Sequence, residues 1–347
     1  MLNILVLQTQ VPFTRGGAEI LCDRLIEELV ARGHSVDTIQ LPFSAVPKSR
    51  LYREMSYWKY LDLDEYAGKK VDLVIGTKFP TYLVNHPNKV IWLVHQHRQA
   101  YELFGTRFSD FDSSINDEAI RSTIYKEDRR SLEEAKKIFT ISPRVTERLK
   151  HYLDINSEIL PPPPPLFGKY FSETKGSYIL SVGRLCSMKR TDMIIKAMPH
   201  VSSSLKLKVV GLADEPGYQD YLDSEVKKHN LADRIEFLGR VNDEQLISLY
   251  ANCFAVSFSP YDEDFGFVTL EALLSGKPVI TTDDAGGVLG FVKDGINGLI
   301  VQPNPEAMSA AINKLCDSDD FYQGLVRNCK LEGSLSWDLI INKLTDL

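Results

Sequence analysis

The sequence predicts an α/β protein made of two doubly wound domains. Apolar runs typical of buried strands alternate with amphipathic stretches typical of helices, which is the pattern of parallel sheets with crossover helices. The alternation stops at a run of five prolines, Pro161–Pro165, and then resumes. The length of 347 residues exceeds that of one ordinary hydrophobic core, so two domains are expected.

The first half of the chain carries the alternation in a looser form. The expected strands cover residues 2–7, 35–41, 73–75, 90–93 and 138–141. The expected helices cover residues 20–31, 117–137 and 145–152. Residues 42–68 are aromatic and charged without a clear period, so they predict an irregular excursion with short helices.

The proline run is the expected linker. Proline cannot donate to a sheet ladder or occupy a helix interior, and consecutive prolines form stiff polyproline II. A proline-rich loop inside one domain is the alternative, but strand patterns restart after it, at residues 178–182, 206–210, 235–238, 254–258, 278–281 and 298–301. We therefore expect domains at 1–165 and 166–330, followed at 331–347 by a helix that begins near Ser336.

Composition sets limits on the class of protein. The chain is 44% hydrophobic and 25% charged, as soluble globular proteins are, and no run of about 18 apolar residues is present. The segment Met1–Leu7 resembles a first strand more than a signal peptide. The five cysteines are scattered without a C-x-x-C pair, which favours reduced thiols in the cytoplasm. The net charge of −7 argues against a broad nucleic-acid surface.

The histidines give no metal-binding pattern of the H-x-x-x-H or H-E-x-x-H type. His95 and His97 alternate at a strand end and would share one side, so a metal pair there is the alternative. We predict no metal site.

The most informative segment contains Glu263 and Glu271, eight positions apart around the turn Asp264-Phe265-Gly266-Phe267. It is expected to form a strand end, a loop and a helix. Ligands of open α/β sheets bind at the carboxyl ends of the strands, and a helix N-terminus suits phosphate. The segment could therefore hold a sugar at Glu263, a phosphate at the helix start and a ribose at Glu271.

The pattern E-x-F-G-x-x-x-x-E followed by A-x-x-x-G-x-P-V-I resembles the E-x7-E signature of the retaining glycosyltransferases of family four. The resemblance is close from Gly176 to about Val301 and looser before it. It implies the GT-B fold, in which two Rossmann-like domains face each other across a cleft, and a final helix that crosses back to the first domain. A plain tail helix is the alternative. The implied donor-binding residues of the segment are Glu263, Phe265, Gly266, Phe267, Val268, Thr269 and Glu271.

Two basic residues follow the first expected strand of the second domain. Arg184 and Lys189 lie two and seven residues after Val182, where they would meet the same site as Glu263. Two fixed cations can neutralise the charge that develops on a leaving diphosphate. The matching residues of the family bind the donor diphosphate, and Arg190 is a competing candidate beside Lys189.

The resemblance implies further contacts. Gly16 and Gly17 match the G-G-A-E loop that meets the donor phosphate and the acceptor, and two glycines would permit positive φ there. Gly239 and Val241 match the positions whose backbone contacts the donor base. His95 matches a histidine beside the transferred sugar, with a purely structural histidine as the alternative.

We predict a retaining glycosyltransferase that uses a nucleotide diphosphate sugar, UDP-glucose or another UDP-hexose, and needs no metal or other cofactor. Glu263, His95, Arg184 and Lys189 would be its catalytic residues. The acceptor would be a glycan or a lipid-linked glycan of surface polysaccharide synthesis. A sugar-phosphate synthase on the same fold and a non-catalytic two-domain sugar-binding protein are the alternatives.

A charged stretch bears on the expected location. Basic residues around Arg129 and Arg130 are interleaved with acidic ones, which favours a solvated helix face. Because many members of the family act on lipid-linked acceptors, peripheral contact of a cytoplasmic protein with the inner membrane face stays open.

Overall fold

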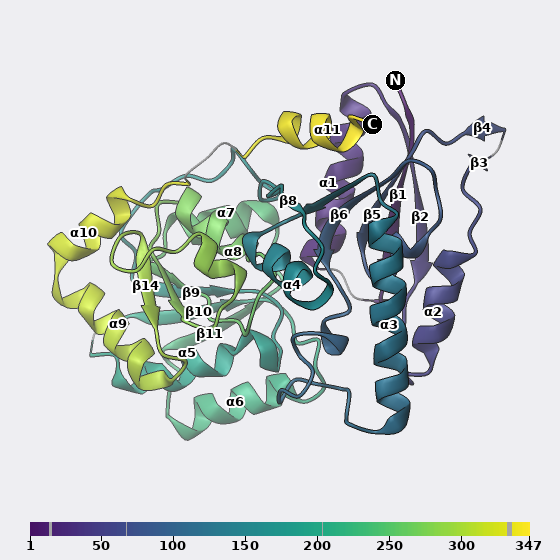
Figure 1. The fold of residues 1–347 in the computed structure, drawn as a ribbon. Coiled ribbons are helices and arrows are strands. Elements are labelled where there is room, and N and C mark those ends of the chain that lie inside the picture. The colour runs from purple at the N-terminus through teal and green to yellow at the C-terminus, as the bar shows by residue number, and fades with distance from the viewer. Residues whose placement is uncertain (14–15, 67, 203, 332–334) are drawn as a thin grey trace. The chain divides into compact units, whose positions relative to one another are not determined.

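The computed structural model describes residues 1–13, 16–66, 68–202, 204–331 and 335–347. The chain forms two compact units (Figure 1). Met1–Pro165 and Leu335–Leu347 make the first unit, and Leu166–Ser334 makes the second. Each unit holds a parallel sheet with crossover helices, so the predicted α/β class is confirmed. No helix among the described residues is long and apolar enough to span a membrane.

The first unit contains a six-stranded parallel sheet with the order β2-β1-β5-β6-β7-β8. Its strands are β1 (Asn3–Gln10), β2 (Ser35–Pro42), β5 (Leu73–Lys78), β6 (Lys89–His95), β7 (Lys137–Thr140) and β8 (Glu158–Ile159). Its main helices are α1 (Gly17–Ala31), α2 (Arg50–Lys59), α3 (Ile115–Glu133) and α4 (Pro143–Leu153). Strand β3 (Glu65–Tyr66) lies in the excursion predicted as irregular and pairs antiparallel with β4 (Lys69–Lys70), directly after that excursion.

Beyond shifts of up to three residues in the ends of β1, β5 and α1, two features of the first unit differ from the prediction. Helix α3 ends at Glu133, whereas the charged pattern predicted helix as far as residue 137. Lys136 donates its backbone N–H to Lys89 O at 2.8 Å, and β7 then pairs with β6, so sheet pairing overrides the helical preference of these residues. Strand β8 has only two residues, too few for a periodic signal.

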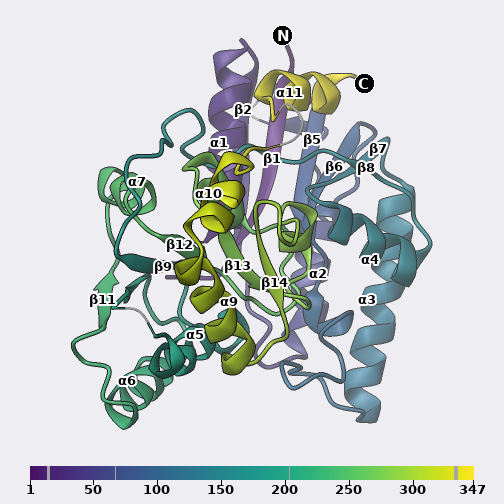
Figure 2. The ribbon, with the colours of Figure 1, turned by 90° about the vertical axis from the view of Figure 1, so that its left-hand side faces the viewer.

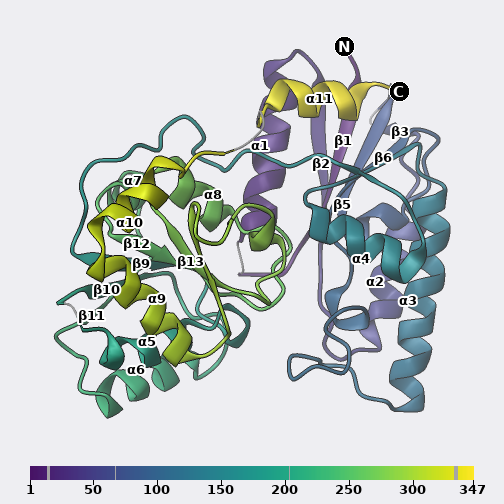
Figure 3. The same cartoon turned by 60° about the vertical axis from the view of Figure 1, so that its left-hand side comes forward.

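The final segment of the chain packs within the first unit. Helix α11 (Trp337–Thr345) lies beside α1 (Figure 3). Trp337 meets the buried Trp92 edge to face at 6.0 Å between ring centroids, and Arg32 donates Nε–H to Asp338 at 3.0 Å. An aromatic pair and an ion pair therefore hold this helix to its unit.

The second unit contains a six-stranded parallel sheet with the order β11-β10-β9-β12-β13-β14 (Figure 2). Its strands are β9 (Tyr178–Val182), β10 (Lys206–Val210), β11 (Ile235–Gly239), β12 (Ala255–Ser257), β13 (Val279–Thr282) and β14 (Gly298–Val301). Its helices are α5 (Thr191–Ala197), α6 (Tyr218–Lys228), α7 (Asp243–Ala251), α8 (Phe267–Leu274), α9 (Pro305–Asp317) and α10 (Asp319–Arg327).

Alternate residues of β9 enter two different cores of the second unit. Ile179 packs with residues of α5, α6, α9 and α10, whereas Leu180 packs with residues of α7 and α8. Successive side chains of a strand point to opposite faces, so helices cover both faces of this sheet. The strand order reverses between β9 and β12, which is the point where doubly wound sheets bind ligands.

Candidate active site

The carboxyl ends of β9 and β12 frame a small hollow in the second unit. Residues 181–184, 189–191 and 257–259 line it, together with Ile194. Two of the predicted cations, Arg184 and Lys189, are among them. The sequence therefore brings its predicted phosphate-binding residues to the strand ends at the switch point.

Lys189 and Glu263 form an ion pair at this position. The Nζ atom of Lys189 lies 2.5 Å from Oε2 of Glu263, and each side chain retains about a fifth of its exposure, at 18% and 20%. Lys189 also lies 5.5 Å from the ring centroid of Phe258. The predicted diphosphate-binding cation and the predicted sugar-binding carboxylate are thus direct neighbours.

Glu263 is held in place by the loop that follows β13. Its backbone N–H donates to Ala285 O at 3.1 Å, and its carbonyl accepts from the Gly287 N–H at 2.7 Å. A Cβ atom at Gly286 would lie 2.6 Å from the Glu263 backbone nitrogen and oxygen. The close approach explains why glycine is needed at position 286.

Arg184 pairs with Asp214, a residue that the sequence analysis missed. Half of the Arg184 side chain is exposed, so this cation lies at the mouth of the hollow. Asp214 comes from the loop after β10, and no local pattern in the sequence links it to Arg184.

Arg190, the competing candidate, serves a different purpose. It is buried, with φ +52°, and donates from Nε to Ser259 O and from Nη2 to Pro260 O, both at 2.7 Å. It also forms a two-pronged ion pair with Asp284 at 2.8 and 2.6 Å. Burial alone would raise the pKa of Asp284, but the bonds from Arg190 lower it. Arg190 therefore joins the loops after β12 and β13 and is occupied within the protein.

Helix α8 begins at this site. Gly266 precedes it with φ +88°, and a Cβ atom there would lie 2.9 Å from Cγ2 of Val288. The buried Phe265 packs edge to face on Phe267 and Phe291, at 5.0 and 5.2 Å between centroids. The first N–H groups of a helix have no intrahelical partner, so the start of α8 can accept an anion.

The predicted residues Val268 and Thr269 occupy the first turn of α8. Val268 packs partly buried against the core of the unit, and Thr269 is buried. The Thr269 hydroxyl has no hydrogen-bond partner among the described residues. It is a polar group available beside the helix start.

Glu271 lies further along α8 and is buried, with 7% of its surface exposed. The Tyr250 hydroxyl donates to its Oε2 at 2.7 Å. Burial raises the pKa of Glu271, while the hydroxyls of Tyr250 and Tyr170 act in the opposite direction. One carboxylate oxygen is thus already oriented by a tyrosine that the sequence did not single out.

The two predicted base-binding positions lie at the end of β11 and in the loop after it. Gly239 ends β11 at the sheet edge with φ +61°, and its carbonyl accepts from the Gly211 N–H at 2.9 Å. Val241 follows in the next loop and packs against the core. Their role toward a base stays a prediction.

His95, Gly16 and Gly17 belong to the first unit. Gly16 precedes α1 with φ −134°, so it does not use the positive φ that a glycine permits. Its N–H donates instead to Glu19 Oε2 at 2.9 Å, and Glu19 Oε1 lies 2.5 Å from Lys78 Nζ. Burial alone would raise the pKa of Glu19, but Lys78 lowers it. This ion pair lies where the strand order reverses between β1 and β5.

His95 ends β6 opposite Lys78 in the sheet register, and its Nδ1 lies 2.7 Å from Gln96 O. His97 is buried against Phe43, Phe79 and Phe111, and burial lowers its pKa to about 4. Across the described residues, no group of three or more His, Cys, Asp or Glu side chains could hold a metal ion.

Comparisons with known proteins bear on the family and the fold of this chain. Residues 165–331 match the family model of the glycosyl transferases, group 1. This match covers nearly all of the second unit, which carries the strand-end hollow, the Lys189–Glu263 pair and helix α8.

Two curated relatives match parts of the chain. An uncharacterised glycosyltransferase of Methanocaldococcus jannaschii is 31% identical over 172 residues, 49% of this chain and 44% of that protein. An alpha-1,3/1,6-mannosyltransferase of Dictyostelium discoideum is 34% identical over 105 residues, 30% of this chain and 25% of that protein. The matches thus span less than half the length of either relative.

Solved structures match over the whole chain. A sucrose-phosphate synthase of Thermosynechococcus elongatus has a TM-score of 0.78 at 18% identity, covering 98% of this chain and 97% of that one. The Anabaena protein HepE, solved with UDP and glucose, has a TM-score of 0.68 at 17% identity, covering 100% and 96%. These likenesses confirm the GT-B fold.

Proposed function

We propose that this chain is a retaining glycosyltransferase that moves a hexose from a nucleotide diphosphate sugar to a glycan or lipid-linked acceptor in surface polysaccharide synthesis. The donor is UDP-glucose or another UDP-hexose. The observation that carries the proposal is the Lys189–Glu263 pair beside the start of α8, at the switch point of the second sheet. The likeness to HepE, which was solved with UDP and glucose, supports a UDP-sugar.

The donor's charge sets the roles of the second unit. As the bond between the sugar C1 and the diphosphate oxygen breaks, negative charge develops on the leaving phosphate. Arg184, Lys189 and the first N–H groups of α8 would stabilise that charge more strongly in the transition state than in the ground state. The acceptor oxygen bonds C1 on the same face, and its proton passes to the leaving phosphate.

Carboxylates would position the rest of the donor. Glu263 would accept hydrogen bonds from the sugar hydroxyls, and Glu271 from the ribose diol. His95 of the first unit would contact the transferred sugar. Because fixed cations and a helix start neutralise the diphosphate, the reaction needs no metal ion or other cofactor.

The test uses the full chain with UDP-, GDP- and ADP-hexoses. A ligand that binds the native state raises its melting temperature, so we expect the largest rise with a UDP-hexose. Slow release of UDP in the presence of EDTA would then demonstrate turnover without a metal. Binding without any release of nucleoside diphosphate would favour the non-catalytic sugar-binding alternative. Loss of activity with EDTA that manganese or magnesium restores would contradict the metal-free site.

A sugar-phosphate synthase is the second candidate, favoured by the TM-score of 0.78 with the sucrose-phosphate synthase. The two activities differ in the acceptor. Transfer to a free hexose phosphate supports this candidate, whereas transfer to a neutral or lipid-linked glycan supports the first. With a lipid-linked acceptor, the protein would work at the inner membrane face, and co-sedimentation with vesicles that contain the acceptor measures that contact.

A further inference from the structure

A second hollow lies in the first unit, at the amino-terminal end of β6. Its volume is about 600 Å³, within the range of small-molecule sites. Lys89, the first residue of β6, lines it, whereas His95 ends the same strand. A strand of this length spans about 20 Å, so the hollow is separate from the strand end that carries His95.

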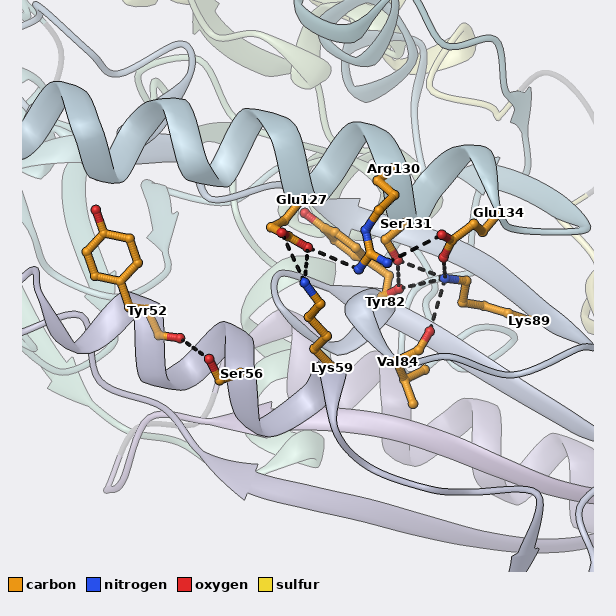
Figure 4. Close-up of polar contacts among 10 residues, drawn as sticks. All are labelled: Tyr52, Ser56, Lys59, Tyr82, Val84, Lys89, Glu127, Arg130, Ser131 and Glu134. Atoms are coloured by element: carbon orange, nitrogen blue, oxygen red, sulfur yellow. Dashed lines mark hydrogen bonds and ion pairs between the residues drawn. The ribbon is translucent and has the colours of Figure 1, made fainter.

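Lys89 cannot serve as an anion site in this hollow. Figure 4 shows its ammonium group surrounded by acceptors. It donates to Tyr82 O at 3.2 Å, Val84 O at 3.0 Å and Ser131 Oγ at 2.8 Å, which uses all three of its N–H groups. The Glu134 carboxylate lies 3.8 Å away. Burial lowers the pKa of Lys89 to about 8, so its ammonium group loses its proton more readily than that of an ordinary lysine.

The second lysine of the wall is also neutralised. Lys59 Nζ contacts both carboxylate oxygens of Glu127 at 3.1 Å (Figure 4). Glu127 accepts a further bond from Arg130 at 3.0 Å. The network orients Lys59 toward α3 and leaves little positive field for a ligand.

The remaining electrostatics disfavour an anion. Helices α2 and α3 end beside the hollow, at Lys59 and Glu133, and a helix C-terminus carries a partial negative charge. Three carboxylates, Asp62, Asp64 and Glu134, line the same hollow. The strand ends of the second unit have the opposite character, with cations and a helix N-terminus.

The polar groups that stay available suit hydroxyls. Asp62 and Asp64 are exposed acceptors, although Oδ1 of Asp62 already accepts from the Asp64 N–H at 3.2 Å, and Asn85 offers an amide. The Asn88 N–H donates to Nδ1 of His86 at 3.1 Å, so the neutral ring carries its proton on Nε2. That Nε2 is buried and has no hydrogen-bond partner among the described residues, so its desolvation is uncompensated, but it is not open to a ligand in this structure.

An aromatic ring completes the wall. Tyr60, directly after α2, is 80% exposed and lines the hollow. A tyrosine ring gives an apolar face with a polar edge, which suits the alternating C–H and hydroxyl surfaces of a sugar. No group of three or more possible metal ligands occurs in the part of the chain that the structure describes, so the carboxylates do not form a metal cluster there.

We propose that this hollow is a second binding site, for a neutral carbohydrate. Asp62 and Asp64 would accept from vicinal hydroxyls, Asn85 would donate, and Tyr60 would pack on the sugar face. The inference concerns binding alone and stands apart from the proposed transfer reaction. A site of this kind would hold a neutral segment of a glycan at a distance from the reacting end.

The experiment measures binding of maltotriose, mannotriose and galactotriose to the full chain by titration calorimetry, with UDP present at saturation. We expect saturable binding of at least one trisaccharide at millimolar concentration. Asp64→Asn should weaken it about tenfold, the scale of one lost hydrogen bond to a charged group. Tyr60→Ala should weaken it about threefold or more.

Tyr57→Ala is the matched control, because Tyr57 lies in the same helix and is 49% exposed but does not line the hollow. It should leave trisaccharide binding unchanged. Both substitutions at the hollow are at exposed positions and should leave the release of nucleotide from the donor sugar unchanged. The proposal is overturned if none of the three sugars binds, if Tyr60→Ala and Asp64→Asn leave binding intact, or if inorganic phosphate displaces the sugar.

Discussion

The carboxyl ends of the strands carry different arrangements of charged side chains in the two sheets. In the second unit, Arg190 and Lys189 are adjacent in the sequence, and each binds a carboxylate from a distant loop, as in the Lys189–Glu263 pair. In the first unit, the corresponding strand ends carry the Glu19–Lys78 pair, which closes the start of α1. The second unit thus concentrates cations where a phosphate would bind, whereas the Glu19–Lys78 pair, from the described part of the first unit, is neutralised locally. We infer that the donor's charge is met by the second unit.

The first prediction tests, by the free energy of unfolding, whether Arg190 is needed for the stability of the second unit. Arg190→Ala removes the partner of the half-buried Asp284 and three further hydrogen bonds, so it should lower the free energy of unfolding by about 3–5 kcal/mol. Urea unfolding measures the loss. Arg240→Ala, at an exposed position of the same unit, is the control and should change the stability little. An equally small loss for Arg190→Ala would mean that Arg190 is free for a ligand.

The second prediction concerns catalysis. Lys189→Ala should lower turnover of the nucleotide sugar by about 10²–10³, the scale of one lost group that stabilises a developing anion. Lys208→Ala, a lysine of β10 that lies 3.8 Å from Glu236, is the control and should retain turnover. Full activity of Lys189→Ala would remove this lysine from the mechanism and shift the proposal to Arg184.

How far the sequence predicted the molecule differs between the units for a physical reason. The six strands of the second sheet were found within one residue at each end, because its core strands are continuous apolar runs between turn residues. In the first unit, α3 was predicted too long, since the pairing of β7 with β6 depends on residues 45 or more positions apart in the register Val90↔Lys137. Tertiary pairing of this kind has no local signal.

The same reasoning applies to the candidate site. The sequence predicted that Glu263, Arg184 and Lys189 lie together at the carboxyl ends of the strands, because parallel strands present these ends on the same side of the sheet. It could not decide between Lys189 and Arg190. That choice depends on carbonyls such as Ser259 O, 69 positions away. Partners such as Asp214 and Tyr250 were missed for the same reason.

The third prediction tests the orientation of the donor in the second unit. Glu271→Gln should weaken binding of UDP by about 1.5–3 kcal/mol at most, because it removes a charged acceptor of the ribose. Glu263→Gln should leave UDP binding nearly unchanged, since UDP lacks the sugar, but should lower turnover of the UDP-hexose. Titration calorimetry with UDP gives both affinities.

Tyr250→Phe is the matched control for Glu271, because it removes only the hydroxyl that orients this carboxylate. It should weaken UDP binding by about 1 kcal/mol or less. A larger effect of Glu263→Gln than of Glu271→Gln on UDP affinity would mean that the donor lies in the reverse direction.

The last prediction tests whether the first unit also keeps a buried carboxylate of the kind seen at Glu271. Asp128 of α3 is fully buried, and the Tyr101 hydroxyl donates to its Oδ2 at 2.7 Å. Burial raises its pKa to about 7 from an ordinary value of 3.8. The folded state therefore binds a proton more tightly than the unfolded state, so this group's contribution to stability is full below about pH 4 and is lost as the pH rises to about 7. The slope is at most about 1.4 kcal/mol per pH unit, the value for one proton.

Asp128→Asn keeps an acceptor for Tyr101 but cannot titrate, so its stability relative to the wild type should rise between pH 5 and pH 7 in urea unfolding. The exposed Asp37→Asn should follow the wild type, and a parallel curve for Asp128→Asn would mean that Asp128 is already ionised when buried.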